Sequence, residues 1–128
     1  MVPAGRLGMK ALIAVVDDEP SVRSSLARLL RSAEYEAATY PSGEEFLQSL
    51  DRDFPDCLIL DLRMPGLSGF DVLARLALAD RRVPVIVLTS FPTSEVRRQA
   101  LREGVAAFLE KPVERATLLA AIDGAIAA

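Results

Sequence analysis

The most informative absence in the sequence is histidine, which occurs at none of the 128 positions. Ser-His-Asp triads, Cys-His pairs and histidine metal sites are therefore excluded for these residues. The single cysteine, Cys57, lies in an apolar run and has no second cysteine with which to form an internal disulfide. Any chemistry must rest on carboxylates, hydroxyls and lysine.

Other shortages narrow the function further. No apolar run approaches the roughly 20 residues that span a membrane, and the first residues lack the apolar core of a signal peptide. A formal net charge of -3 argues against a broad nucleic-acid interface. Neither common glycine-rich phosphate loop is present, which counts against a nucleotide-binding protein. What remains is the composition and length of one ordinary globular domain.

Short apolar runs alternate with helical patterns along the chain. The runs cover residues 11–16, 35–39, 57–60, 85–88 and 106–109, and the helical patterns cover residues 20–30, 42–50, 70–76, 95–103 and 118–126. Strict alternation of this kind predicts an α/β fold, with a five-stranded parallel sheet covered by helices on both faces. We expect one domain at residues 10–128, preceded by an N-terminal extension at residues 1–9.

Polar side chains follow four of the apolar runs. Asp17 and Asp18 come after the first run, Asp61 after the third, Thr89 and Ser90 at the end of the fourth, and Lys111 just after the fifth. Parallel strands bring their carboxyl ends to one edge of the sheet, where ligands bind in such folds. The sequence therefore predicts a site made of three carboxylates, two hydroxyls and one ammonium group.

The predicted site has a consistent chemistry. Three crowded aspartates repel one another, and a hard divalent cation such as Mg²⁺ relieves that repulsion through a few carboxylate oxygens. A carboxylate beside the ion can act as a nucleophile and form an acyl phosphate. The ammonium and hydroxyl groups can then stabilise charge on the transferring group.

In this order, the motifs Asp17-Asp18, DLRMPG at 61–66, Thr89-Ser90 and Lys111-Pro112 resemble the response-regulator receiver domain. The resemblance extends over about residues 10–127. The motifs MPGLSG at 64–69 and EKP at 110–112 are similar to those of the FixJ-type branch of transcriptional regulators. The resemblance implies a three-layer, flavodoxin-like, doubly wound (βα)5 fold with strand order 2-1-3-4-5.

The resemblance also implies roles at the acceptor. Asp61 would receive a phosphoryl group from a phosphohistidine on a sensor histidine kinase. Asp18 and Asp61 would coordinate Mg²⁺, or Mn²⁺ as a substitute, through their side chains, and Arg63 through its backbone carbonyl. Asp17 would hold the ion largely through water. Lys111 would pair with Asp61 and later with its phosphate.

Further implied roles concern the switch. Thr89 would swing toward the phosphoryl oxygen, and the rotamer of Phe108 would follow it. Phenylalanine lacks the hydroxyl of the tyrosine that is also common at this position, so coupling would rely on packing. Arg63, Ser90 and Phe91 would flank the phosphate, and we expect Arg63 and Phe91 to influence acyl-phosphate hydrolysis by controlling water access.

The same resemblance implies partners. The fourth helix, fifth strand and fifth helix would mediate phosphorylation-dependent homodimerisation or contact with an output domain. Any DNA contact would come through an output domain absent from this chain, with a helix-turn-helix as the expected type. The chain would be either a stand-alone receiver or the receiver of a longer regulator. We expect a cytoplasmic protein without membrane contact.

Three alternatives stand beside this interpretation. Asp18 could simply cap the helix that begins at Pro20. An aspartyl-phosphate hydrolase also places a nucleophilic aspartate after a strand, but usually carries a second aspartate two residues later, where this chain has Arg63. A degenerate receiver could serve only as an interaction module, which the intact set of Asp61, Thr89 and Lys111 argues against.

Overall fold

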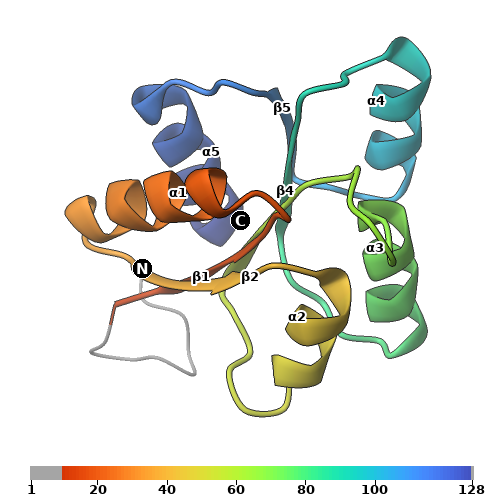
Figure 1. Cartoon of the computed structure of the whole chain (residues 1–128), viewed down its shortest axis with the longest axis horizontal. Coiled ribbons are helices and arrows are strands. Elements are labelled where there is room, and N and C mark those ends of the chain that lie inside the picture. Colours follow the sequence, from red (N-terminus) through yellow and green to blue (C-terminus); the bar gives the residue numbers. More distant parts are fainter. Residues whose placement is uncertain (1–9, 128) are drawn as a thin grey trace.

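The computed structural model describes residues 10–127, in which five strands alternate with five helices (Figure 1). The extension expected at residues 1–9 lies outside the described residues. The elements are β1 (Leu12–Val16), α1 (Pro20–Ser32), β2 (Glu36–Tyr40), α2 (Gly43–Ser49), β3 (Cys57–Leu60), α3 (Gly69–Leu78), β4 (Val85–Thr89), α4 (Ser94–Arg102), β5 (Ala107–Glu110) and α5 (Arg115–Ala127).

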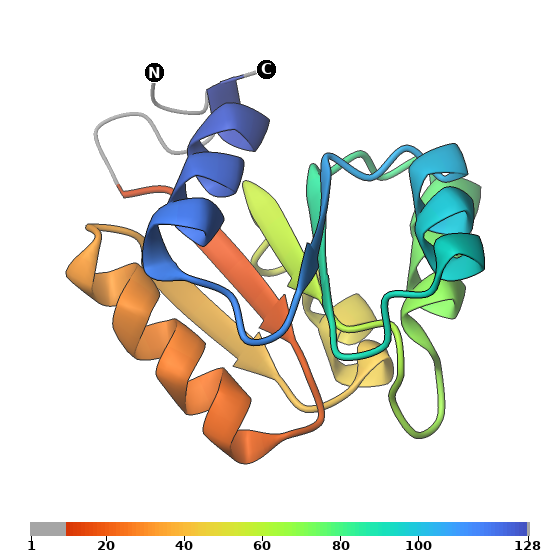
Figure 2. The same ribbon diagram turned by 90° about the horizontal axis from the view of Figure 1, so that it is seen from above.

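The five strands form one parallel sheet in the order β2-β1-β3-β4-β5, which confirms the expected fold and strand order. Every residue of β1, β3 and β4 is buried, as continuous apolar runs require when helices cover both faces of a sheet. Val16 pairs with Leu60, and Leu60 pairs with Val87. The carboxyl ends of the central strands therefore lie level at one edge of the sheet (Figure 2).

The helices form two layers, with α1 and α5 on one face of the sheet and α2, α3 and α4 on the other (Figure 2). Alternate strand residues point into these two layers. Ile13 and Val15 pack in the core beneath α1 and α5, and Ala14 and Val16 pack in the core beneath the other three helices. Each apolar strand thus contributes to two cores at once.

Local capping sets where several helices begin. Pro20 occupies the first turn of α1, where its missing N–H has no consequence. Asp18 does not cap this helix: the cap residue is Glu19, and its side chain makes no capping hydrogen bond. At α2, the Ser42 hydroxyl accepts from the backbone N–H of Glu45. At α3, Ser68 and Asp71 form a reciprocal capping box.

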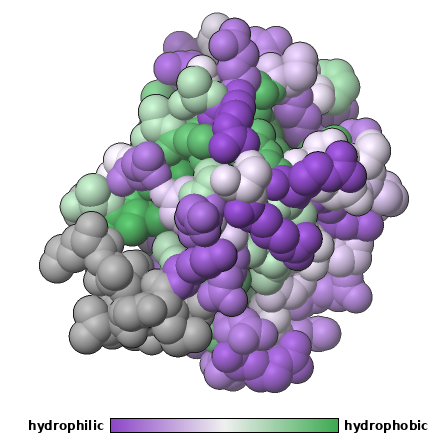
Figure 3. Space-filling model, turned by 90° about the vertical axis from the view of Figure 1, so that its left-hand side faces the viewer, coloured by the Kyte–Doolittle hydropathy of each residue, from purple (hydrophilic) through white to green (hydrophobic). Residues whose placement is uncertain are grey.

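Helix α4 makes the thinnest contact with the core, as its sparse apolar pattern predicts. Ala100 is its one buried residue, and Gly104 adopts a positive φ of 84° just after the helix ends. The face shown in Figure 3 is mostly hydrophilic, with small apolar areas between polar side chains. Within residues 10–127, no helix combines the length and the apolar character that crossing a membrane would need.

Candidate functional site

The three aspartates predicted from the strand ends meet at the carboxyl edge of the sheet. Asp17 and Asp18 follow β1, and Asp61 follows β3, its immediate neighbour. One carboxylate oxygen from each of these residues lies within 4.8 Å of the other two. Asp17 and Asp61 are 2% and 6% exposed, so the negative charge is concentrated where little water can screen it.

Asp17 forms four hydrogen bonds, two through its backbone and two through its carboxylate. Its backbone N–H donates to the Tyr40 carbonyl, and its own carbonyl accepts from the Arg23 guanidinium at 2.7 Å. One carboxylate oxygen accepts from the Glu19 N–H at 2.9 Å, and the other accepts from the Lys111 ammonium at 2.7 Å. Asp17 is therefore largely committed to contacts within the protein.

Lys111 enters the site from the loop after β5 and lies between two carboxylates. Its ammonium is 2.7 Å from Asp17 and 3.4 Å from Asp61. The expected pairing with Asp61 is thus present, but the shorter contact is with Asp17. The Lys111 side chain is only 12% exposed, so both contacts are partly shielded from water.

The pKa values of this group follow from its geometry. Burial raises the pKa of Asp61, and the charge of Asp17 acts in the same direction, while Lys111 opposes both. Burial by itself would lower the pKa of Lys111, but the hydrogen bond to Asp17 and the two carboxylate charges outweigh it and raise that pKa. Lys111 therefore stays charged, and Asp61 is the residue of this group whose ionised form the fold disfavours.

The three carboxylates suit a hard divalent cation. They supply only oxygen ligands, which Mg²⁺ prefers, and few enough of them to leave positions for water or phosphate. Neither carboxylate oxygen of Asp17 is free of protein contacts, whereas the Asp18 carboxylate forms no hydrogen bond or ion pair with residues 10–127. Asp18 and Asp61 are thus better placed than Asp17 for direct coordination.

Thr89 and Phe108 lie on the same face of the sheet. Phe108 pairs with Val87 across β4 and β5, and Thr89 is two residues beyond Val87 on the same strand. The Thr89 hydroxyl is buried and accepts from the Phe91 N–H at 3.2 Å. The Phe108 ring packs in the core beneath α4, with the Arg97 guanidinium 5.6 Å from its centroid. Their roles as a coupled switch stay a prediction.

The residues expected to flank the phosphate are brought together only in part. The Arg63 guanidinium lies 4.1 Å from the centroid of the Phe91 ring, so the two side chains stack. Phe91 is 54% exposed even though Arg63 stacks on its ring. Ser90 is exposed, and its hydroxyl forms no hydrogen bond with residues 10–127.

Two residues near the site were not identified from the sequence. Arg23 on α1 binds the Asp17 carbonyl. The sequence does not predict this contact, because nothing distinguishes Arg23 from the other arginines of this amphipathic helix. Gly69, the first residue of α3, lies so close to the acceptor loop that a Cβ there would be 2.6 Å from the Asp61 carbonyl oxygen. The two glycines that follow Asp61, Gly66 and Gly69, were a signal for this close approach.

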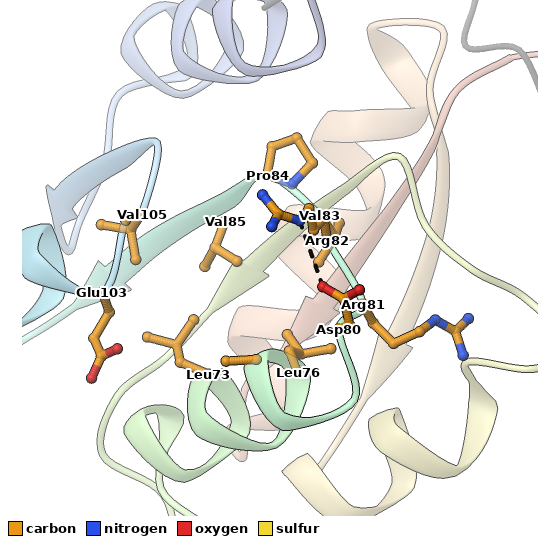
Figure 4. Close-up of a pocket in the computed structure, with 12 residues that line it drawn as sticks. Leu73, Leu76, Asp80, Arg81, Arg82, Val83, Pro84, Val85, Glu103 and Val105 are labelled. Carbon is orange, nitrogen blue, oxygen red and sulfur yellow. Dashed lines mark ion pairs between the residues drawn. The ribbon is translucent and has the colours of Figure 1, made fainter.

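A separate cavity of about 550 Å³ lies at the opposite edge of the sheet (Figure 4). Its apolar lining comes from the end of α3, the start of β4 and the turn before β5. Asp80 and Arg82 form an exposed ion pair at its rim. The acidic cluster lies at the other end of the strands, so this cavity is not part of the candidate site.

Comparison with known sequences is consistent with the geometry. Residues 13–123 match the family model described as the response regulator receiver domain. The chain is 39% identical over 113 residues to nodulation protein W of Bradyrhizobium diazoefficiens, covering 88% of this chain and 50% of that protein. It is 37% identical over 113 residues to the transcriptional regulatory protein FixJ of Azorhizobium caulinodans, covering 86% of this chain and 52% of that protein. The chain thus spans about half the length of these curated relatives.

A comparison with solved structures gives the same fold. The crystal structure of FixJ-N superposes with a TM-score of 0.85 at 32% identity, covering 93% of this chain and 95% of that one. The acidic cluster therefore lies in a scaffold shared with a regulator of the FixJ type.

Proposed function

The chain belongs to the response regulator receiver domain family, and from this premise we propose that it is a phosphorylation switch whose acceptor is Asp61. A receiver is a signalling domain rather than a conventional enzyme. The proposed phosphodonor is a phosphohistidine on a sensor histidine kinase. The observation that carries the proposal is the convergence of buried Asp17 and Asp61 with half-buried Asp18 and Lys111 at one edge of the sheet.

In the proposed transfer, a carboxylate oxygen of Asp61 attacks phosphorus while the bond between phosphorus and the donor imidazole nitrogen breaks. The electron pair of that bond leaves with the imidazole, and Asp61 becomes an acyl phosphate. Folding disfavours the ionised Asp61 carboxylate, because burial and Asp17 raise its pKa. The nucleophile is therefore poorly stabilised before transfer, and Lys111 lies within reach to compensate charge on the product.

We assign the metal site to Asp18 and Asp61 as direct ligands, with the Arg63 backbone carbonyl as a third and Asp17 acting mainly through water. The expected ion is Mg²⁺, with Mn²⁺ as a substitute. When bound, such an ion would neutralise carboxylate charge and orient phosphate oxygens. The contacts that Asp17 makes with Glu19 and Lys111 support its more distant role.

The proposed output passes through Thr89 and Phe108 to α4. Before phosphorylation the Thr89 hydroxyl accepts from the Phe91 N–H. A phosphoryl group on Asp61 offers this hydroxyl a charged acceptor, and charge-assisted hydrogen bonds are the stronger kind. Movement of Thr89 would vacate space on the face that Phe108 shares, and α4, with one buried residue, can shift at little cost.

The proposed partners follow from the family. The surface of α4, β5 and α5 would mediate phosphorylation-dependent homodimerisation or contact with an output domain, and DNA binding would belong to that output domain. We propose residues 10–128 as the receiver, with residues 1–9 as an extension. We propose a cytoplasmic location, which a buried, unpaired Cys57 fits.

Phosphorylation can be tested with MgCl₂ and acetyl phosphate, followed by intact-protein mass spectrometry. We expect a mass gain of one phosphoryl group in the wild type and none in Asp61→Asn. The control Asp53→Ala removes an exposed aspartate outside the site and should still be phosphorylated. No gain in the wild type, or an equal gain in Asp61→Asn, would overturn the proposal. Sustained turnover of phosphate esters would favour an aspartyl-phosphate hydrolase instead.

A further inference from the structure

The Arg23 side chain reaches from α1 to the backbone that carries the acidic pair. Its guanidinium donates to the Asp17 carbonyl oxygen at 2.7 Å. That oxygen belongs to the peptide group joining Asp17 to Asp18, so the hydrogen bond fixes the plane from which the Asp18 side chain departs. Arg23 is also tied at its other end, because its backbone N–H donates to the Glu19 carbonyl at 3.1 Å.

The orientation of the Asp17–Asp18 peptide group sets where the Asp18 side chain begins. The Asp18 carboxylate forms no hydrogen bond or ion pair with residues 10–127 that would hold it in place. Asp17 is held through its N–H and its carboxylate, and the hydrogen bond from the Glu19 N–H to that carboxylate spans the Asp17–Asp18 peptide group. None of these contacts involves the carbonyl oxygen of that peptide group, which Arg23 binds from α1. Arg23 therefore adds a second constraint, and Arg donors are well suited to a fixed contact because the guanidinium is planar and rigid.

We infer that Arg23 is a positioning residue for the divalent-cation site, acting through the Asp17–Asp18 peptide group without touching the ion. This inference rests on the proposed function, because it assigns Asp18 as a direct ligand. Residues that orient metal ligands from outside the coordination shell commonly change metal affinity when they are replaced. Arg23 would be such a residue, with the backbone rather than a side chain as its target.

Because Arg23 is charged, the direction in which its replacement changes the Mg²⁺ affinity tests the inference. A guanidinium hydrogen-bonded to the Asp17 carbonyl repels a cation bound at the acidic cluster, so loss of its charge alone would strengthen Mg²⁺ binding. Loss of its positioning hydrogen bond would weaken Mg²⁺ binding. The two effects oppose each other, and a purely structural role would alter stability with no change in Mg²⁺ affinity.

The experiment measures the Kd for MgCl₂ by NMR titration in the wild type, Arg23→Gln, Arg23→Lys and Arg28→Gln, together with urea unfolding of each. We expect Arg23→Gln to raise the Kd by about tenfold, and Arg23→Lys, which keeps the charge and a donor, to restore part of the affinity. Arg28→Gln removes the same charge from an exposed position on the same helix, where the guanidinium has no partner among residues 10–127. It should leave the Kd within about twofold.

A Kd for Arg23→Gln that falls or stays at the wild-type value overturns the inference. The inference also fails if Arg28→Gln raises the Kd as much as Arg23→Gln. Failure of the proposed function looks different, since then the wild type itself would not bind Mg²⁺ at this site and Asp18→Asn would change nothing. If Arg23→Gln is too unstable to titrate, Arg23→Lys alone decides, with a raised Kd expected and an unchanged Kd contradicting the inference.

Discussion

The Lys111 ammonium lies 2.7 Å from Asp17 and 3.4 Å from Asp61, so its closer partner is the aspartate that is not the proposed acceptor. Burial raises the pKa of Asp61, and the charge of Asp17 adds to this effect, while Lys111 offsets the two only in part. The closer contact of Lys111 with Asp17 lets Asp61 change its charge without leaving Lys111 unpaired. The relationship between Lys111 and Asp17 therefore underlies the first two predictions.

Lys111→Met should destabilise the metal-free protein. It removes the cation from two buried carboxylates, and the loss should be about 2 kcal/mol of unfolding free energy, below the usual range for buried pairs because this edge of the sheet is near solvent. Added MgCl₂ should restore more stability to this variant than to the wild type, since the ammonium no longer competes with the ion. Urea unfolding with and without MgCl₂ measures both effects.

The control for Lys111→Met is Arg82→Met, which removes an ion pair with Asp80 whose side chains are 92% and 88% exposed. Exposed pairs contribute little, so its effect should stay within about 1 kcal/mol. An equal loss in the two variants would show that Lys111 is not coupled to the buried carboxylates.

Asp61→Asn should stabilise the metal-free protein at neutral pH. Burial raises the pKa of Asp61 in the folded state above its ordinary value of 3.8. Protonation of Asp61 therefore stabilises the folded protein, and this contribution is fully present below pH 3.8. It is lost as pH rises through the folded-state pKa, because folding disfavours the ionised form. Asparagine keeps the shape without the charge, and the gain should be roughly 1 kcal/mol.

This gain should shrink as pH falls toward the ordinary pKa of aspartate, where the wild-type carboxylate also becomes neutral. Urea unfolding at several pH values, in the presence of a chelator, gives the profile. A gain that stays constant with pH would contradict an electrostatic origin, and a loss at neutral pH would contradict the strained state of Asp61.

Cys57 should be unreactive until the protein unfolds. Its side chain is completely buried in β3, and burial raises the pKa of the thiol to about 12. Because the thiolate is the reactive form, a disulfide-exchange reagent at pH 8 should react at a rate that follows urea-induced unfolding. A matched control is Ala116→Cys in a Cys57→Ala background, which places a thiol at an exposed position on α5 and should react at once. Rapid reaction of native Cys57 would show that the central sheet opens locally.

Two glycine-to-alanine substitutions should have opposite effects. In Gly69→Ala, the new methyl group would lie 2.6 Å from the Asp61 carbonyl oxygen and 2.7 Å from the Leu62 Cα, so the acceptor loop must shift. We expect a loss of about 1–3 kcal/mol and altered chemical shifts around Asp61. Gly124→Ala, in the interior of α5 with nothing within 4 Å of the new methyl group, should instead stabilise by about 0.5–1 kcal/mol. Equal effects at the two positions would refute the close approach of α3 to Asp61.

The sequence predicted the fold and most of the acidic site because both depend on short-range patterns. Continuous apolar runs identify buried parallel strands, and the residue after each run lies at the carboxyl edge, so Asp17 and Asp61 could be placed together. Contacts that depend on how far a long side chain extends could not be predicted from the sequence. Lys111 lies closer to Asp17 than to Asp61 by less than an ångström, and Arg23 reaches back to a carbonyl on the preceding loop. Neither contact follows from the spacing of residues in the sequence. Residue type pointed to Asp18 as a possible cap of α1, whereas the cap position is held by Glu19, whose side chain makes no capping hydrogen bond.

The stacked pair of Arg63 and Phe91 gives the last prediction, which concerns the lifetime of the phosphorylated state. The guanidinium lies 4.1 Å from the ring centroid, and the Arg63 backbone N–H donates to the Asp61 carboxylate at 3.3 Å. We expect Arg63→Ala to admit water and to speed hydrolysis of phosphorylated Asp61 by about two- to fivefold, the factor equivalent to the ~0.5–1 kcal/mol of an exposed cation–π contact. Because the two side chains act as one cover, Phe91→Ala and the double variant should show the same increase as Arg63→Ala.

The measurement is the decay of the phosphorylated mass after the phosphodonor is removed. Arg81→Ala is the matched control, because its guanidinium lies 4.6 Å from the centroid of Phe54 in a cation–π pair of the same kind away from the site. It should leave the lifetime unchanged. An unchanged lifetime in the Arg63 and Phe91 double variant would show that the stacked pair does not control water at Asp61. Additive effects of the two single variants would instead show that the side chains act separately, one through its charge and the other through its bulk.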